Sequence, residues 1–281
     1  AFARVAGGEE ELIAAPDVDA VAICTRHGSH ADLAARALAA GKHVFCEKPI
    51  ALNVAELERV QHAVARSGRV LGVGFNRRFS PLLEEARGFL AQDGAPVTAM
   101  FRVSAGELPP DHWVHDLEEG GGRIVGEVCH FVDCIRFLCA HPIAEVHAAA
   151  KRQVGAPRQA HDTVTVTLTL ANGAIGSILY VSEGARGLPK ERLEAFAAHR
   201  TVVLDDFRTL ELLDGRSRRQ RKLRAQDKGH RGELSAFVSG VRDGRHPVSL
   251  DEVWNVHLAT FGIVESIRTG RPVRIHATSG T

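Results

Sequence analysis

The first 77 residues alternate between short apolar runs and longer segments with helical spacing. Unbroken apolar runs of this kind are typical of buried strands in a parallel sheet. We expect strands at 20–24, 44–46 and 70–73, and helices at 9–14, 30–40 and 54–66. Asn53 precedes the last of these helices and Gly68 follows it, as helix caps commonly do. Strands that alternate with single helices predict a parallel sheet with right-handed crossovers.

After residue 80 the pattern changes to alternation of apolar and polar residues, which indicates strands with one exposed face. The clearest example is TVTVTLTL at 163–170, followed by the hairpin signal Asn172-Gly173 and a strand at 174–181. Further strands are expected at 97–103, 192–197 and 201–204, and helices at 82–90, 124–139 and 251–268. The pattern therefore predicts an α/β domain over residues 1–80, followed by an α+β domain with an open antiparallel sheet over residues 81–281. Because the exposed face of such a sheet is commonly covered by another subunit, we expect a homodimer or homotetramer.

The composition narrows the class of protein. The 281 residues carry 35 basic and 34 acidic side chains, a formal net charge of +1, which gives no general attraction to nucleic acid or membranes. The basic run RSRRQRKLR at 216–224 lacks interleaved aromatic residues, so we interpret it as a solvated hairpin rather than a nucleic-acid site. No apolar stretch reaches the roughly 18 residues of a membrane helix.

The cysteines and histidines give no sign of a disulfide framework or a metal site. The five cysteines include no Cys-x-x-Cys pair, and the 15 histidines include no His-x-x-x-His pair. A reducing, cytoplasmic setting and no bound metal are therefore expected.

Polar residues follow two of the expected parallel strands. The first strand leads into Thr25-Arg26-His27-Gly28-Ser29-His30, and the second into Glu47-Lys48-Pro49. Ligands of open parallel sheets bind beyond the carboxyl ends of the strands, so both clusters should lie at one edge. Pro49 restricts the backbone at Lys48, which would aim the ammonium group at a ligand. An ordinary loop capped by Ser29 and a solvated Glu47–Lys48 pair remain the alternatives.

The stretch GGGRIVGEVCHFVD at 120–133 opens a helix with three glycines, and a helix N-terminus favours anions. At helical spacing, His130 lies at the border of the buried stripe and Glu127 one turn before it. A carboxylate that orients an imidazole is suited to acid–base chemistry, whereas a structural hydrogen bond is the alternative role for His130. The same spacing directs Asp133 away from the core, into solvent.

Four stretches together resemble the Gfo/Idh/MocA family, named for glucose–fructose oxidoreductase and inositol dehydrogenase. They are PDVDAVAICT, AGKHVFCEKP, GFNRRFSP and GGGRIVGEVCHFVD, and they span nearly the whole chain. The resemblance implies a Rossmann domain, here partial, and a substrate-binding and oligomerisation domain. It also implies hydride transfer between NAD or NADP and a hydroxyl or carbonyl carbon of a sugar, sugar derivative or cyclitol.

The same resemblance implies roles for individual residues. Lys48 would lie by the nicotinamide and the substrate, and His130 would be the catalytic acid or base, with Glu127 as its carboxylate partner. Thr25, Arg26, His27, His30 and Glu47 would border the cofactor together with Lys48. The family pattern places an aspartate where this chain has Gly126, so Glu127, one residue further on, would have to replace it.

The start of the chain departs from the family pattern. The first strand, the G-x-G-x-x-G turn and the acidic residue that binds the ribose do not appear, and residues 1–6 have the character of a continuing segment. We therefore expect an N-terminal portion to be missing. The stretches PKERLEAF and AQDKGHRGEL are most similar to a subgroup found as the C-terminal part of bi-domain oxidoreductases. The chain on its own is not expected to bind NAD(P) tightly, and a non-catalytic binding or regulatory relative is the alternative function.

Overall fold

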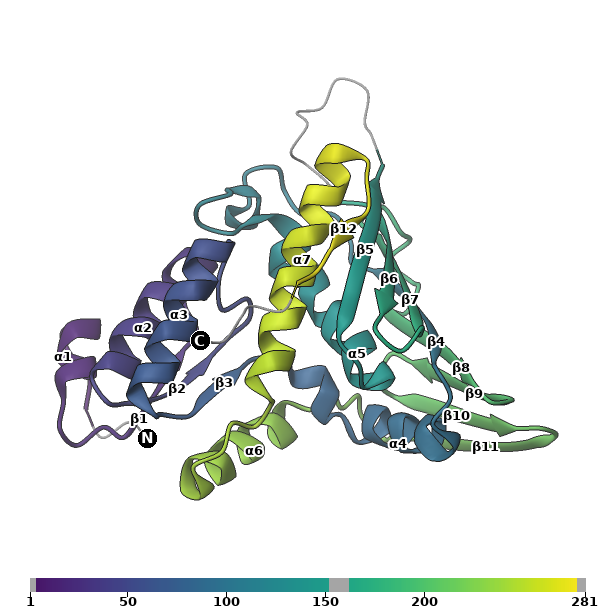
Figure 1. Cartoon of the computed structure of the whole chain (residues 1–281), viewed down its shortest axis with the longest axis horizontal. Helices are drawn as coiled ribbons and strands as arrows, with labels where there is room; N and C mark the ends of the chain where they lie inside the picture. Colours follow the sequence, from purple (N-terminus) through teal and green to yellow (C-terminus); the bar gives the residue numbers. More distant parts are fainter. Residues whose placement is uncertain (1–3, 152–161, 277–281) are drawn as a thin grey trace.

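The computed structural model describes residues 4–151 and 162–276; residues 1–3, part of the start discussed above, lie outside this range. A short helix, α1 (Glu9–Ala14), precedes a parallel sheet whose strands are adjacent in chain order. The strands are β1 (Ala20–Ile23), β2 (His43–Cys46) and β3 (Leu71–Val73), connected by α2 (His30–Ala39) and α3 (Val54–Ser67). Both helices lie on one face of this sheet (Figure 1). The predicted parallel α/β arrangement is confirmed.

Local capping explains where α3 begins and ends. The side chain of Asn53 accepts a hydrogen bond from the backbone N–H of Glu56, which satisfies a donor at the helix start. Gly68 ends the helix at φ 62°, in the left-handed conformation that glycine adopts without strain.

The rest of the chain builds a nine-stranded sheet in the order β11-β10-β9-β8-β4-β7-β6-β5-β12. The strands are β4 (Thr98–Ser104), β5 (Ile143–Ala150), β6 (Val164–Leu170), β7 (Ile175–Val181), β8 (Glu191–Ala197), β9 (Arg200–Asp205), β10 (Thr209–Asp214), β11 (Ser217–Lys222) and β12 (Val273–Arg274). Every neighbouring pair is antiparallel except β4 and β7, which run parallel. The predicted fold class is therefore confirmed, with one parallel pair in an otherwise antiparallel sheet.

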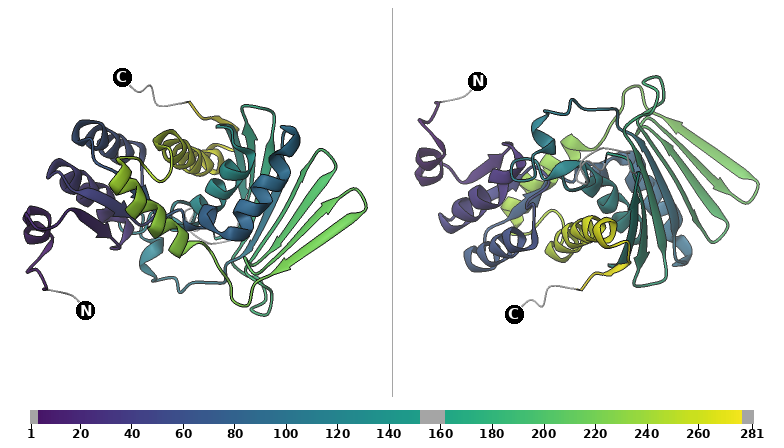
Figure 2. Two further views of the ribbon diagram at one scale, coloured as in Figure 1. Left: turned by 90° about the horizontal axis from the view of Figure 1, so that it is seen from below. Right: turned by 90° about the horizontal axis from the view of Figure 1, so that it is seen from above.

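Helices cover one face of this sheet. They are α4 (Pro81–Leu90), α5 (Cys129–Cys139) and α7 (Leu250–Thr269), and α7 lies between the two sheets (Figure 2). On the other face no described helix packs, and Met100, Ile175, Leu179 and Phe196 are exposed there. No helix within the described ranges is long and apolar enough to cross a membrane.

A helix that we did not predict, α6 (His230–Asp243), returns to the first sheet. Its Phe237 packs on Phe45 of β2 with ring centroids 5.6 Å apart, and a Cβ at Gly72 of β3 would lie 2.9 Å from Phe237. This contact buries β2 and β3 on both faces, whereas in β1 Ala20 and Ala22 are exposed. The interpretation of 20–24 as a fully buried strand was therefore wrong within the described part of the chain.

The basic run at 216–224 forms the solvated hairpin that we expected. Strand β11 pairs with β10, and all six of its residues are exposed. Its charges are partly balanced by acidic neighbours, since Arg218 pairs with Glu211 and Arg221 with Glu85.

Candidate active site

The loops that follow β1 and β2 lie side by side at the carboxyl edge of the first sheet, as predicted. The buried ring of His30 joins them: Nδ1 lies 2.8 Å from the carbonyl oxygen of Pro49, and Nε2 lies 3.0 Å from that of Thr25. His30 therefore holds the two loops together rather than facing a ligand. Thr25 is exposed, and its hydroxyl lies 2.7 Å from that of Ser29.

A cavity of about 220 Å³ opens beside this edge, between the first sheet and the helix that begins after the three glycines. Four of the residues predicted from the sequence line it: His27, Lys48, Glu127 and His130. Its volume is below the roughly 300–1,000 Å³ typical of pockets for drug-sized ligands, so it suits one small molecule.

Lys48 reaches from the end of β2 to the other wall of the cavity. Its Nζ donates a hydrogen bond of 2.5 Å to the carbonyl oxygen of Gly126. Within the described ranges it has no carboxylate partner, so the solvated Glu47–Lys48 pair is not what the structure contains. The carboxylate of Glu47 is instead close to Gly74, where a Cβ would lie 2.7 Å from Oε2.

The helix that carries His130 does not begin as an α-helix. Residues Ile124–Val128 form a π-helical segment, and α5 starts only at Cys129. A π-turn makes i→i+5 hydrogen bonds and turns the following residues by about one position relative to a continuous α-helix. Our spacing argument assumed an unbroken α-helix, so the neighbour that it predicted for Glu127 was wrong. The prediction that Asp133 is solvated was wrong for another reason: α5 is buried on all sides rather than along one stripe.

Glu127 interacts with three residues other than His130. Its Oε1 accepts from Lys190 Nζ at 2.6 Å, and its Oε2 accepts from the Tyr180 hydroxyl and from Arg123 Nη2 at 3.3 Å. Burial alone would raise the pKa of Glu127, but Lys190, Tyr180 and Arg123 lower it to about 2. The carboxylate is therefore ionised, and the hydrogen bond expected between Glu127 and His130 does not form.

His130 is buried, and its Nδ1 has no hydrogen-bond partner in the part of the chain that the structure describes. Burial, followed by the nearby cations Arg77, Lys48 and Lys190, lowers its pKa well below the usual value. The ring is therefore neutral at physiological pH, and one of its two nitrogens is unprotonated.

Asp133 is also buried, at 1% exposure, instead of solvated. Its carboxylate accepts hydrogen bonds from Arg78 Nε and Nη2, and Arg78 Nη1 donates to Glu252 at 2.7 Å. This network is structural and fixes α5 against the segment that follows β3.

His27 fills the space next to Gly126. A Cβ at Gly126 would lie 2.8 Å from Cε1 and 3.2 Å from Nδ1 of the His27 ring. Nδ1 of His27 lies 2.8 Å from the carbonyl oxygen of Gly120, and the ring packs edge-on against Trp113 with centroids 4.7 Å apart. Burial, with Lys48 and His30, lowers the pKa of His27 to about 4. A side chain at position 126 would displace this neutral ring.

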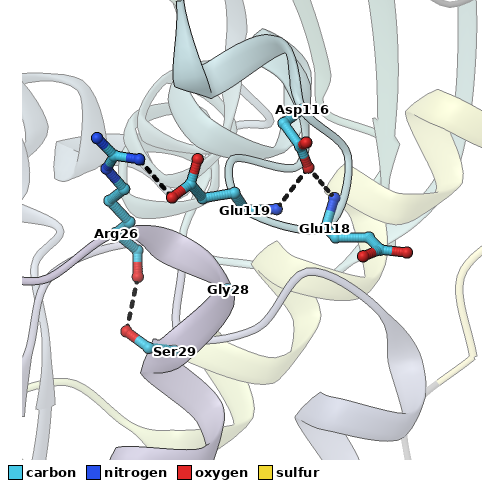
Figure 3. Close-up of a pocket in the computed structure, with 6 residues that line it drawn as sticks. All are labelled: Arg26, Gly28, Ser29, Asp116, Glu118 and Glu119. Carbon is cyan, nitrogen blue, oxygen red and sulfur yellow. Dashed lines mark hydrogen bonds and ion pairs between the residues drawn. The ribbon is translucent and has the colours of Figure 1, made fainter.

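Arg26 faces outward, into a second cavity of about 420 Å³ formed between its loop and the 116–119 loop. Figure 3 shows its guanidinium paired with Glu119, while Asp116 accepts from the backbone N–H groups of Glu118 and Glu119. The guanidinium also lies 5.7 Å from the Trp113 ring centroid. These contacts hold the loop around Trp113 against the end of β1, where Trp113 lines the first cavity.

Four residues at or near the cavity were not among the predicted site residues. Arg77 follows β3, and Arg123 directly precedes the π-helical segment. Tyr180 lies in β7 of the nine-stranded sheet, and Lys190 lies directly before β8. Arg77 lies in the matching stretch GFNRRFSP and Lys190 in PKERLEAF, in a polar cluster (Lys190-Glu191-Arg192) that could face the substrate or a subunit partner, so both had a weak signal. Tyr180 occupies an inward position of β7, where the alternating pattern predicts only an apolar residue.

No three His, Cys, Asp or Glu side chains within residues 4–151 and 162–276 are placed to hold a metal ion. The described cysteines are all free, with Cys24 exposed and the other four buried.

Comparison with known proteins agrees with this arrangement. Residues 4–75 match the oxidoreductase family with an NAD-binding Rossmann fold, and residues 93–202 match the GFO/IDH/MocA C-terminal domain. The chain is 30% identical to inositol 2-dehydrogenase of Acidothermus cellulolyticus, over 96% of this chain and 80% of that protein. It is 25% identical to scyllo-inositol 2-dehydrogenase (NAD(+)) of Bacillus subtilis, over 94% of this chain and 80% of that protein.

Among solved structures, an oxidoreductase domain protein from Kribbella flavida superposes with a TM-score of 0.84 at 25% identity, covering 96% of this chain and 83% of that one. The chain therefore belongs to the Gfo/Idh/MocA family of oxidoreductases, which includes NAD-dependent inositol dehydrogenases.

Proposed function

We propose that this protein transfers a hydride between NAD or NADP and a hydroxyl or carbonyl carbon of a sugar, sugar derivative or cyclitol. The observation that supports this most is the convergence of Lys48 and His130 on one small cavity at the carboxyl edge of the parallel sheet. In the oxidation of an alcohol by a nicotinamide, a neutral imidazole can take up the hydroxyl proton and a fixed cation can stabilise the negative charge that develops on the oxygen.

Lys48 positions the reacting oxygen. One of its three N–H donors is used by the Gly126 carbonyl, which leaves donors for a substrate hydroxyl. With no carboxylate partner among the described residues, its positive charge stabilises the negative charge that develops as the hydroxyl loses its proton.

His130 accepts that proton in the oxidation and returns it in the reduction. Its lowered pKa keeps the ring neutral, so one ring nitrogen has a lone pair that can accept the proton. Glu127 does not hold His130; it binds Arg123, which also lines the cavity, and Lys190.

The nicotinamide end of a dinucleotide would lie at the edge formed by the predicted residues Thr25, Arg26, His27, His30, Glu47 and Lys48. Of these, His27 and Lys48 line the cavity, and His30 fixes the two loops that converge there. When bound, the nicotinamide supplies the carbon that accepts or donates the hydride. None of the described residues forms the glycine-rich turn that binds a pyrophosphate.

We also propose that the chain divides into two domains at residue 80, although α6 returns to the first sheet. We further propose that copies of the protein assemble through the open face of the nine-stranded sheet. Met100, Ile175, Leu179 and Phe196 expose apolar surface on that face. A cytoplasmic location remains a prediction, supported by the free cysteines. A relation to bi-domain oxidoreductases also remains a prediction, which the genomic reading frame upstream of Ala1 tests.

The direct test is the transfer of a labelled hydride. A panel of inositols and sugars deuterated at single carbons is incubated with the protein and NAD⁺ or NADP⁺, and the nicotinamide is analysed by mass spectrometry. We expect deuterium in the reduced nicotinamide for at least one polyol. Cofactor binding, measured by fluorescence, without any deuterium transfer would instead favour a non-catalytic relative.

A further inference from the structure

A second imidazole lines the candidate cavity and has no chemical role in the proposed reaction. His27 is 8% exposed, and it forms part of the cavity wall, as His130 does. The ring of His27 packs edge-on against Trp113, whereas the ring of His130 packs against Phe75. The two imidazoles are therefore held by different neighbours and approach the cavity from different sides.

The hydrogen bond at Nδ1 fixes the tautomer of His27. Nδ1 lies 2.8 Å from the carbonyl oxygen of Gly120, and a carbonyl oxygen can only accept, so Nδ1 carries the proton. Burial is the main cause that lowers the pKa of His27 to about 4, which keeps the ring neutral at physiological pH. Because a neutral ring has a single N–H, Nε2 of His27 is unprotonated and can only accept a hydrogen bond.

This Nε2 is available to a ligand. Among the described residues it has no hydrogen-bond partner, and unlike Nδ1 of His130 it is not sealed from solvent. Because His27 lines the cavity and is otherwise buried, its accessible atoms face the cavity. Once a ligand displaces water from the cavity, an acceptor without a donor is unfavourable, so the ligand has to supply a donor.

Gly126 makes room for this ring and places Lys48 beside it. A Cβ at Gly126 would lie 2.8 Å from Cε1 of His27, and the carbonyl oxygen of Gly126 accepts a hydrogen bond from Nζ of Lys48. The charge of Lys48 contributes to the lowered pKa of both His27 and His130. The ammonium group therefore lies near both imidazoles, and one small molecule in the cavity can contact all three side chains.

From these contacts we propose that the substrate is a vicinal diol, and that His27 accepts a hydrogen bond from the hydroxyl next to the reacting one. The inference rests on the proposed function, in which Lys48 and His130 bind the reacting hydroxyl. Lys48 has three N–H groups and uses one for Gly126, so it can donate to both substrate oxygens. His27 is then a specificity-determining residue, because a substrate without the second hydroxyl leaves its Nε2 unpaired.

The experiment replaces the second hydroxyl. Deuterium transfer from myo-inositol, D-glucose or D-galactose to the nicotinamide identifies the reacting carbon, and the hydroxyl on each adjacent carbon is then replaced by hydrogen or by fluorine. Fluorine cannot donate a hydrogen bond, so at one position the deoxy and the fluoro analogue should both lower kcat/KM at least about tenfold. Full turnover of every deoxy analogue, or of every fluoro analogue, overturns the inference and leaves the hydride transfer intact.

A variant of His27 tests the same contact from the protein side. His27→Phe keeps an aromatic ring against Trp113 but removes the acceptor, so it should lower kcat/KM for the polyol about tenfold and abolish the penalty for the deoxy analogue. The exposed His62→Phe is the control and should keep the full penalty. A His27→Phe variant that discriminates between the two substrates as the wild type does overturns the inference.

Nitrogen-15 NMR tests the tautomer without turnover. We expect Nε2 of His27 to give the chemical shift of an unprotonated nitrogen, and this resonance should move when the polyol is added together with NAD⁺. A proton on Nε2 overturns the inference. If no polyol is turned over, movement of the resonance by one of the three polyols supports the contact with His27 while the proposed function fails. A resonance that none of them moves overturns the inference.

Discussion

The contact between Gly126 and His27 makes the most specific structural prediction, tested by Gly126→Ala. The new Cβ would lie 2.8 Å from His27 Cε1, closer than real Cβ contacts, and 3.4 Å from Val114 Cγ2. The ring is held by its contact with the Gly120 carbonyl oxygen and by Trp113. Overpacking of this kind costs about 1–3 kcal/mol.

The gain in helix propensity from alanine opposes this cost but is smaller, so the variant should be destabilised. Gly126 does not adopt a positive φ, so alanine gains up to about 1 kcal/mol of helix propensity. We expect a net loss of about 1–2 kcal/mol and a lower kcat/KM, because the Gly126 carbonyl anchors Lys48. The matched control is Gly88→Ala in α4, where no atom lies within 4 Å of the added Cβ; it should be neutral or stabilising.

Urea denaturation of Gly126→Ala, His27→Ala and the double variant provides the assay. If the ring is the obstacle, the double variant loses at least about 1 kcal/mol less than the sum of the single variants. Additivity within about 0.5 kcal/mol would refute the reasoning, since the two sites would then not compete for the same space.

Three further predictions concern stability and assembly. Asp133→Ala leaves Arg78 partly uncompensated in a buried site and should cost about 3–5 kcal/mol in urea denaturation, whereas the exposed Asp32→Ala should cost less than about 1 kcal/mol. Burial and the charge of Glu47 raise the pKa of Glu233 to about 9, from an ordinary glutamate pKa of 4.5. Between these two pH values, Glu233 is protonated in the folded state and ionised in the unfolded state. The free energy of unfolding should therefore fall as pH rises from about 4.5 to 9, by up to about 1.4 kcal/mol per pH unit. Glu233→Gln should remove this fall when the free energy of unfolding is measured at pH 5 and 8. An unchanged dependence on pH in the variant would contradict the prediction. Phe196→Glu should dissociate the assembly in sedimentation analysis if the open sheet face is the interface, and an unchanged mass would rule that face out.

The parallel strands and their polar ends were predictable because the signals are local. A run such as Val44-Phe45-Cys46 is apolar on both faces, and the residues after it must lie at the carboxyl edge of the sheet. The convergence of Lys48 and His130 followed from this placement together with the family resemblance.

The partners of Glu127 were not predictable in the same way. They depend on the π-helical segment at 124–128, which changes the angular relation between Glu127 and His130, and no residue type in GGGRIVGEVCHFVD requires that segment. They also depend on Tyr180 and Lys190, which are more than 50 residues away in the sequence. Helix α6 was missed because its apolar residues are few and its first turn follows a polar loop.

The central claim is that Lys48 and His130 carry the reaction in the cavity. It is tested most directly by kcat/KM for Lys48→Met and His130→Asn, with the exposed Lys222→Met and His62→Asn as matched controls. The account predicts a loss of at least about 100-fold for each site variant, with cofactor binding retained and the controls near wild type. Turnover near the wild-type rate in either site variant would contradict the claim.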